Sequence, residues 1–196
     1  LSTAGFSDIA GTTLVHACGG AAALAGVIVL GAREGRFGSK GEKRSMVPFA
    51  ASSIPLVTLG TFLLGFGWFG FNGFSQLAMG TFDDVNAISK IAVNTHLAGA
   101  AGTVAGATIT RLMAGKTDIV MMLNGALAGL VAITAEPLTP SPILAILIGF
   151  VGALIMYFGT KFLESQRLDD VVGAIPVHMF AGIFGTLVVP ASNPET

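Results

Sequence analysis

The stretch Asp8–Gly20 reads DIAGTTLVHACGG, and it returns near the other end of the chain as Asp170–Gly182, DVVGAIPVHMFAG. Both segments fit the frame D-x-x-G-x-x-x-V-H-x-x-x-G, with five identities at fixed spacing. Each copy opens a long apolar run and places a His inside it, His16 in the first and His178 in the second. Burying an imidazole without a partner is costly, and an ionisable residue inside a membrane marks a functional site. The repeat therefore predicts two halves of a fold that meet at a shared site.

The composition is that of a membrane protein. Of the 196 residues, 53% are hydrophobic and only 11% are charged, with 27 Gly and a mean hydropathy of +0.79. Soluble domains carry about 25% charged residues. The net charge of −1 carries no information about partners, and no basic patch in the sequence suggests a nucleic-acid partner. The lone Cys18 excludes a disulfide within the chain, and we expect it to be a small packing residue.

Six apolar runs are long enough to predict membrane-spanning helices, which need about 20 mostly apolar residues. They cover approximately Gly11–Gly31, Val47–Asn72, Ala87–Met113, Ile119–Ala135, Ile143–Phe162 and Gly173–Pro190. The expected fold class is therefore an all-α polytopic membrane helix bundle. We expect residues 1–196 to form a single transmembrane domain that is part of a larger protomer, since the chain opens on Leu1 with no initiator Met.

The cations indicate the orientation of the bundle. Nine of the ten Lys and Arg residues fall on one side of an alternating six-span arrangement, and Lys90 is the exception. The cation-rich side is expected to be cytoplasmic. The first helix then runs inwards and the sixth outwards, so the repeat is inverted. Each His follows its Asp by eight residues, or about 12 Å of helix. The two imidazoles therefore approach the midplane from opposite faces, which is the layout of a transport pathway.

Two other interpretations of the histidines stay open. They are compatible with two unrelated, hydrogen-bonded core residues, although the repeated frame disfavours this. A metal site needs third and fourth ligands at similar depth. His96 is the one remaining His, and no carboxylate is predicted at mid-depth.

The carboxylates are expected at helix starts and in loops. Asp8 and Asp170 begin their helices, where a carboxylate caps backbone N–H groups and complements the helix dipole. Asp8 also lies on the expected entry side for a cation. Asp169 and Glu136 are predicted to be solvated.

An aromatic stretch and several glycines complete the pattern. Residues 65–75 read GFGWFGFNGFS and end the second run near the outer face. They fit either an interfacial aromatic belt or a narrow apolar constriction with cation–π character. Small-residue faces that predict close helix packing contain Gly19, Gly20, Gly26, Gly99, Gly102, Gly106, Gly182 and Gly185.

Four ordered motifs resemble those of the ammonium transporter (Amt/Mep/Rh) family. They are Asp8–His16 (DIAGTTLVH), Gly67–Asn72 (GWFGFN), Asn124–Thr134 (NGALAGLVAIT) and Leu168–Gly182 (LDDVVGAIPVHMFAG). Their order and spacing follow the family over essentially the whole chain, which resembles the fifth to tenth membrane helices. The resemblance implies an eleven-helix protomer in a homotrimer within a lipid bilayer, with one pore per protomer and no cofactor.

The resemblance also implies roles for individual residues. His16 and His178 match twin, mutually hydrogen-bonded pore histidines. Phe71 matches a gating Phe, and Trp68 and Leu64 match pore-lining positions nearer the middle. Asp8 and Ser75 match an essential carboxylate and a hydroxyl of the outer ammonium recruitment site.

The chain departs from the family pattern in several places. Gly173 stands where some members carry a second Asp, and Val171 stands where Pro is usual. The second gating Phe, the aromatic wall of the recruitment site and the C-terminal tail fall outside the chain. In the family that tail helps to couple the transporter to P-II-type regulators on the cytoplasmic side.

These observations predict an ammonium transporter or channel of the cell membrane that serves nitrogen uptake and is not an enzyme. NH4+ would bind outside and release its proton, and NH3, with or without that proton, would pass the His pair. Methylammonium would be an analogue of the substrate. The alternatives are an ammonium sensor, in which an Amt-like domain is coupled to a signalling module, and an intramembrane metalloenzyme.

Overall fold

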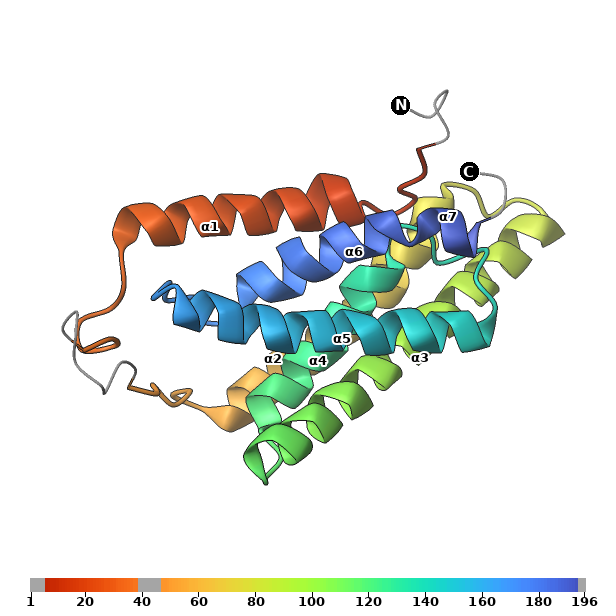
Figure 1. Cartoon of the computed structure of the whole chain (residues 1–196). Helices are drawn as coiled ribbons and strands as arrows, with labels where there is room; N and C mark the ends of the chain where they lie inside the picture. The colour runs from red at the N-terminus through yellow and green to blue at the C-terminus, as the bar shows by residue number, and fades with distance from the viewer. Residues whose placement is uncertain (1–5, 39–46, 194–196) are drawn as a thin grey trace.

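The computed structural model describes residues 6–38 and 47–193 of the chain. In these residues every regular element is a helix. The helices are η2 (Thr12–Ala17), α1 (Cys18–Leu30), α2 (Ile54–Gly73), η3 (Phe74–Gln76), α3 (Phe82–Ala114), α4 (Ile119–Ile133), α5 (Pro142–Ser165), η4 (Ile175–Phe180), α6 (Ala181–Leu187) and α7 (Val189–Ser192). They form six rods (Figure 1), because η2 runs into α1, η3 ends α2, and η4, α6 and α7 follow one another. The predicted all-α bundle is confirmed.

Helices α3, α4 and α5 form the packed centre, and glycines allow their close contact. A Cβ atom on Gly102 would lie 2.2 Å from the Gly125 carbonyl oxygen, and one on Gly149 would lie 2.1 Å from that of Ala98. Most of the predicted small-residue positions are closely packed. Backbone atoms lie against Gly20, Gly102, Gly106, Gly182 and Gly185, and the Leu130 side chain lies against Gly99. Gly19 and Gly26 face open space instead. Backbone contact of this kind drives helix association in lipid.

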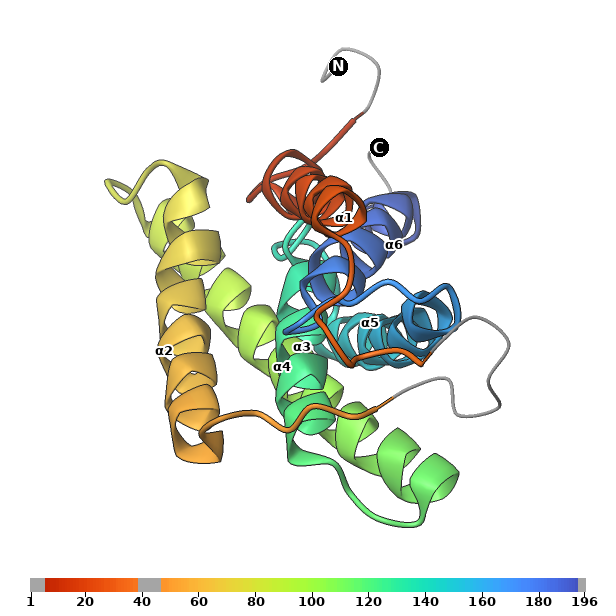
Figure 2. The same cartoon turned by 90° about the vertical axis from the view of Figure 1, so that its left-hand side faces the viewer.

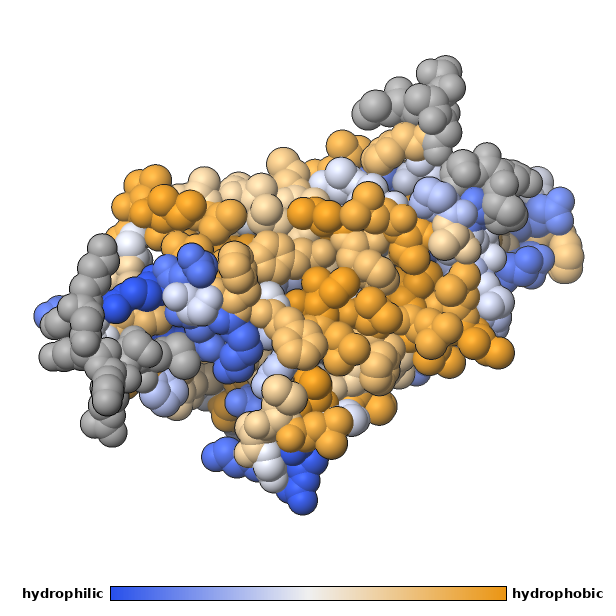
Figure 3. All heavy atoms as spheres, viewed as in Figure 1, coloured by the Kyte–Doolittle hydropathy of each residue, from blue (hydrophilic) through white to orange (hydrophobic). Residues whose placement is uncertain are grey.

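Helices α1 and α2 lie at the periphery of this centre, with α2 on the left in Figure 2 and α1 at the top beside α6. Gly20 is the only buried residue of α1, and α2 buries only Trp68, Asn72 and Gly73. A broad apolar surface covers the middle of the molecule, with hydrophilic residues gathered towards its ends (Figure 3). This distribution matches a bilayer-spanning protein.

Helix boundaries differ from prediction where capping decides them. The second helix begins at Ile54 rather than Val47, because Ser53 accepts a hydrogen bond from the Leu56 N–H and Pro55 suits the first turn. The third begins at Phe82, five residues before Ala87, because Thr81 and Asp84 form a reciprocal capping box. The predicted sixth helix is divided into η4, α6 and α7.

Fewer helices than predicted meet the length and apolarity expected of a membrane span. In the described part of the chain three helical stretches do so, Thr12–Leu30, Ile54–Gln76 and Pro142–Ser165. Helix α4 has 15 residues and spans only about 22 Å. Helix α3 is long, but Asn94, Thr95 and His96 lower its hydropathy.

The loop that carries Asp169 is held by ion pairs, whereas a solvated Asp169 was predicted. Asp169 is 5% exposed and accepts hydrogen bonds from Arg33 at 2.7 Å and 2.9 Å and from Arg36 at 3.3 Å. Arg36 also pairs with Glu164 at 3.1 Å. The Arg33 hydrogen bonds lower the pKa of Asp169 to about 2. This network ties the end of α1 to the end of α5. Lys40, Lys43 and Arg44 of the same predicted inner loop lie outside the described residues.

Glu136 is also buried, where a solvated turn residue was predicted. It is 3% exposed and accepts hydrogen bonds from the Ser7 hydroxyl, the Thr139 N–H and the Asn193 amide. Its neighbours come from both ends of the chain, which lie close together (Figure 1). Burial of a loop carboxylate depends on which distant segments cover it, and sequence spacing carries no such information.

Candidate functional site

The two copies of the repeated frame form the same turn. Gly11 has a φ of 92° and Gly173 a φ of 78°, a left-handed conformation that glycine adopts without strain. Asp8 Oδ2 accepts the N–H groups of Thr13 and Leu14 at 3.0 Å and 3.1 Å. Asp170 accepts those of Gly173, Ala174 and Ile175 at 2.7–3.1 Å. The predicted capping by both aspartates is thus present.

Each histidine lies in a π-helical turn. His16 belongs to η2 and His178 to η4. Such wide turns are rare and occur frequently at functional sites. The sequence analysis expected ordinary helices here. The sequence offered one sign of this irregularity, the glycine that recurs in the frame as Gly11 and Gly173. A glycine there indicates an irregular helix start, but it does not specify the turn that follows.

The last glycine of each copy brings the two helices into contact. A Cβ atom on Gly20 would lie 2.5 Å from the Met179 backbone nitrogen, and one on Gly182 would lie 3.3 Å from that of Ala17. Each glycine thus meets the residue directly after the histidine of the other copy. Helix α1 lies beside the η4–α6 rod, and the two run in opposite directions (Figure 1).

The histidines meet at this crossing. The Nδ1 atoms of His16 and His178 are 3.2 Å apart, and the rings are stacked with centroids 5.2 Å apart. In a hydrogen bond between two neutral imidazoles one Nδ1 donates and the other accepts, so the two Nε2 atoms take opposite roles. His16 is 8% exposed, and its Nε2 is buried without a partner among the described residues. The pair therefore presents one hydrogen-bond donor and one acceptor to a small molecule beside it.

Two aromatic side chains of α2 lie against His16. The Trp68 indole stacks on the imidazole at 5.0 Å with an interplanar angle of 12°, and the Phe71 ring lies at 5.4 Å. Trp68 is 5% exposed, so it does not belong to an interfacial belt. Its indole N–H donates to the Thr134 hydroxyl at 2.9 Å.

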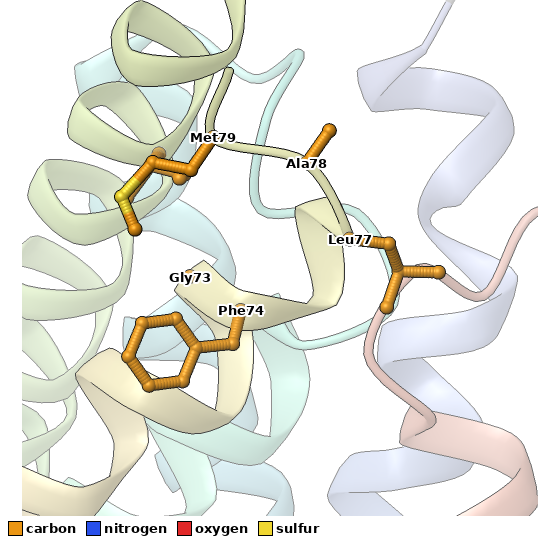
Figure 4. A pocket seen from close by; sticks show the side chains of 6 residues that line it. Gly73, Phe74, Leu77, Ala78 and Met79 are labelled. Carbon is orange, nitrogen blue, oxygen red and sulfur yellow. The ribbon is translucent and has the colours of Figure 1, made fainter.

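Leu64 and Ser75 share the face of α2 and η3 that carries Trp68 and Phe71, since positions 64, 68, 71 and 75 are spaced by four, three and four residues. Among the described residues no hydrogen bond joins Ser75 to either histidine. Leu64 is 52% exposed, and the Ser75 hydroxyl donates to the Phe71 carbonyl oxygen at 2.8 Å. A pocket of about 230 Å³ beside Ser75 is lined by apolar residues including Phe74, Leu77 and Met79 (Figure 4), and it does not include the histidines.

The third histidine is separate from the pair. His96 is exposed on α3 and stacks on Phe69 at 6.0 Å. The described residues hold no group of three His, Cys, Asp or Glu side chains arranged to bind a metal ion.

A side chain at Gly173 would require a left-handed backbone and a shift of the Asn124 side chain. A Cβ atom there would lie 2.6 Å from Asn124 Nδ2, which donates to the Val172 carbonyl oxygen at 3.0 Å. The backbone is also left-handed at this position. The departure from the family pattern at residue 173 is therefore built into the packing of α4 against the second turn.

Fold and site together define a polytopic α-helical integral membrane protein in which two oppositely directed helices join a histidine pair. The model of the Ammonium Transporter Family matches residues 1–193, and the chain belongs to this family.

Individual relatives agree with this assignment. The chain is 45% identical over 185 residues to ammonium transporter Amt2 of Archaeoglobus fulgidus, covering 94% of this chain and 38% of the relative. It is 44% identical to the putative ammonium transporter sll1017 of Synechocystis, covering 96% and 42%. Among solved structures, a sensor Amt protein superposes with a TM-score of 0.88 at 35% identity, covering 95% and 44%. Mep2 of Candida albicans superposes with a TM-score of 0.84 at 29% identity, covering 96% and 40%. The chain thus spans about two fifths of the length of these proteins.

Proposed function

We propose that the whole protein conducts ammonium across the cell membrane and that His16 and His178 line its path. The observation that carries the proposal is the contact of the two rings, 3.2 Å apart at Nδ1, from two oppositely directed copies of one sequence frame. An inverted repeat with polar groups at the midplane is characteristic of transport pathways. Membership of the ammonium transporter family supports ammonium as the substrate.

In this proposal the cation is recruited at the outer end of the site. Asp8 caps η2 with one oxygen, and its other oxygen, Oδ1, is buried without a partner among the described residues. Phe71 supplies an aromatic face nearby, and Ser75 lies one turn further out. A carboxylate and a π-face both attract NH4+. Moving a bare cation past apolar side chains is costly, so NH4+ releases its proton to water at the recruitment site and continues towards the histidines as NH3.

The histidines then take NH3. One imidazole nitrogen accepts an N–H of ammonia and another donates to its lone pair, which replaces hydrogen bonds lost on leaving water. Trp68 and Leu64 border this segment, and the stacked rings exclude other polar groups. We expect the protomer to form a homotrimer in the lipid bilayer and to meet a P-II-type regulator at its cytoplasmic face.

The test is flux through the full-length protein in vesicles. An inward ammonium gradient should produce a signal from an internal pH dye or a membrane current, and methylammonium should compete. An equal gradient of KCl should produce none. Vesicles that respond to ammonium no faster than protein-free vesicles would contradict the proposal.

An ammonium sensor is the second candidate, because a sensor Amt protein superposes on the chain at 35% identity. In that case the full-length gene encodes a soluble signalling domain, and ammonium changes the activity of that domain. A full-length gene without such a domain would remove this candidate.

A further inference from the structure

The last turn of α4 is hydrogen-bonded to Trp68 and to the segment that precedes His16, and the rings of Trp68 and His16 stack on each other. Thr134 follows the final helical residue of α4 and is 0% exposed. Its side chain reaches Trp68 on α2, and its main chain reaches the turn that precedes His16. Neither helix is adjacent to α4 in sequence.

The side-chain bond has one possible direction. An indole N–H only donates, so Thr134 Oγ1 accepts from Trp68 Nε1 at 2.9 Å. The Thr134 hydroxyl proton is directed to the Leu130 carbonyl oxygen at 2.6 Å. The hydroxyl is therefore fixed by its own helix, and it holds the indole plane in one orientation. That plane lies within 12° of the His16 ring.

The main-chain bonds hold the segment that begins η2. The Ala10 N–H donates to the Thr134 carbonyl oxygen at 3.2 Å, and the Ile9 N–H donates to that of Ala135 at 2.8 Å. The Thr12 hydroxyl donates to the Val131 carbonyl oxygen at 2.9 Å. Carbonyl groups at a helix end lack intrahelical donors, so these bonds satisfy both segments.

We propose that Thr134 is a positioning residue for the His16 site, which sets the spacing between the indole and the imidazole. The inference rests on the proposed function, because it concerns the same path for ammonia. Thr134 touches no transported molecule. It acts through Trp68, whose N–H would otherwise be an unsatisfied donor in a buried site. An indole free to turn changes the width of the path and therefore its selectivity by size.

The test is a double-mutant cycle in the full-length protein, with flux in vesicles divided by the amount of inserted protein. Thr134→Val keeps the shape of the side chain and removes the acceptor, and Trp68→Phe keeps a ring and removes the donor. Each should lower ammonium flux about tenfold, the effect of losing a buried hydrogen bond of roughly 1–1.5 kcal/mol. Each should also shift the ratio of methylammonium to ammonium flux. Thr134→Ser should restore both readouts to within about twofold.

Because the two residues act through one bond, the double variant should be no slower than the slower single variant. Thr103→Val is the matched control, since in the described part of the chain the Thr103 hydroxyl bonds only to the Gly99 carbonyl oxygen of its own helix. Losses that multiply in the double variant, or a Thr134→Val protein indistinguishable from Thr103→Val, would overturn the inference. If Thr134→Val does not accumulate, Thr134→Ala takes its place in the cycle. A wild-type protein without ammonium flux would instead refute the proposed function itself.

Discussion

Asp8 combines two roles that one substitution can separate. Its Oδ2 caps two backbone N–H groups of the His16 helix, whereas its Oδ1 is buried without a partner in the described part of the chain. A cap requires only an acceptor, and an Asn oxygen supplies one. Attraction of a cation requires the charge. The free oxygen indicates that the charge serves more than the cap.

We expect full-length Asp8→Asn to fold and assemble but to take up ammonium about tenfold more slowly or worse, equivalent to losing roughly 1.4 kcal/mol of attraction. Asp8→Ala should in addition lose about 1 kcal/mol of stability with the cap. Uptake by vesicles and thermal unfolding in detergent measure the two effects. Normal uptake by a well-folded Asp8→Asn protein would show that Asp8 is a cap alone.

Some contacts of individual residues could be predicted from the sequence, and others could not. The contact of His16 with His178 follows from the repeat, because opposite directions and equal depth converge on one place. The family resemblance implied a pore-lining Trp68, but its stack on His16 was not predicted, since spacing does not fix the rotation of α2 against η2. Burial of Asp169 and Glu136 was not predicted, because Arg33 and Arg36 lie more than 130 positions from Asp169, and Ser7 and Asn193 lie 129 and 57 positions from Glu136.

Among the helices, the crossing of α1 with η4 decides whether the histidines meet. Gly20 sits against the backbone of Met179, whereas its neighbour Gly19 has nothing within 4 Å of its Cβ position. Backbone atoms cannot move aside as a flexible side chain does. The two adjacent glycines of one helix therefore form a matched pair for mutation.

Gly20→Ala should force the two helices apart, lower the stability by about 1–3 kcal/mol, the typical cost of overpacking, and reduce ammonium flux. Gly19→Ala should stay within about 0.5 kcal/mol of wild type. Thermal unfolding in detergent and vesicle flux of the full-length proteins compare them. Equal behaviour of the two variants would mean that the crossing is not close-packed in the whole protein.

The helices themselves were predicted well because long apolar runs dominate their sequences. The predicted first residues of α2 and α3 were wrong, since Ser53 and Thr81 act as N-terminal caps within otherwise apolar or ambiguous stretches. The π-turns were missed, since their extra residue depends on how the two helices cross.

Across the whole molecule, the Asp169 network joins segments at the end that is predicted to face the cytoplasm. Asp169 accepts hydrogen bonds from Arg33 and Arg36, so it joins the segment after α1 to the loop that precedes η4. The folded-state pKa of about 2 lies below the value of about 3.9 for an unfolded Asp. A depressed pKa contributes stability that is present above the unfolded value and is lost as the pH falls through the folded one.

Full-length Asp169→Asn should therefore be less stable than wild type at pH 6, by about 1–3 kcal/mol, and the difference should shrink as the pH falls from about 4 to 2. Asp83→Asn is the control, because Asp83 is exposed at the outer start of α3. Unfolding temperatures in detergent across this pH range give the comparison. A difference that stays constant down to pH 2 would exclude the ionised Asp169 as its source.

In the proposed mechanism the repeated frame builds an ammonia path from His16 and His178, and ammonium flux through histidine variants is the decisive measurement. The experiment compares the full-length variants His16→Ala and His178→Ala in vesicles. His96→Ala is the control, because His96 lies outside the pair. We predict that both pair variants remain inserted but that their ammonium flux, or its selectivity over K+, falls by at least about tenfold. Such a loss corresponds to roughly 1.4 kcal/mol of the barrier. His96→Ala should keep both the flux and the selectivity. Pair variants with the wild-type rate and selectivity would contradict the account.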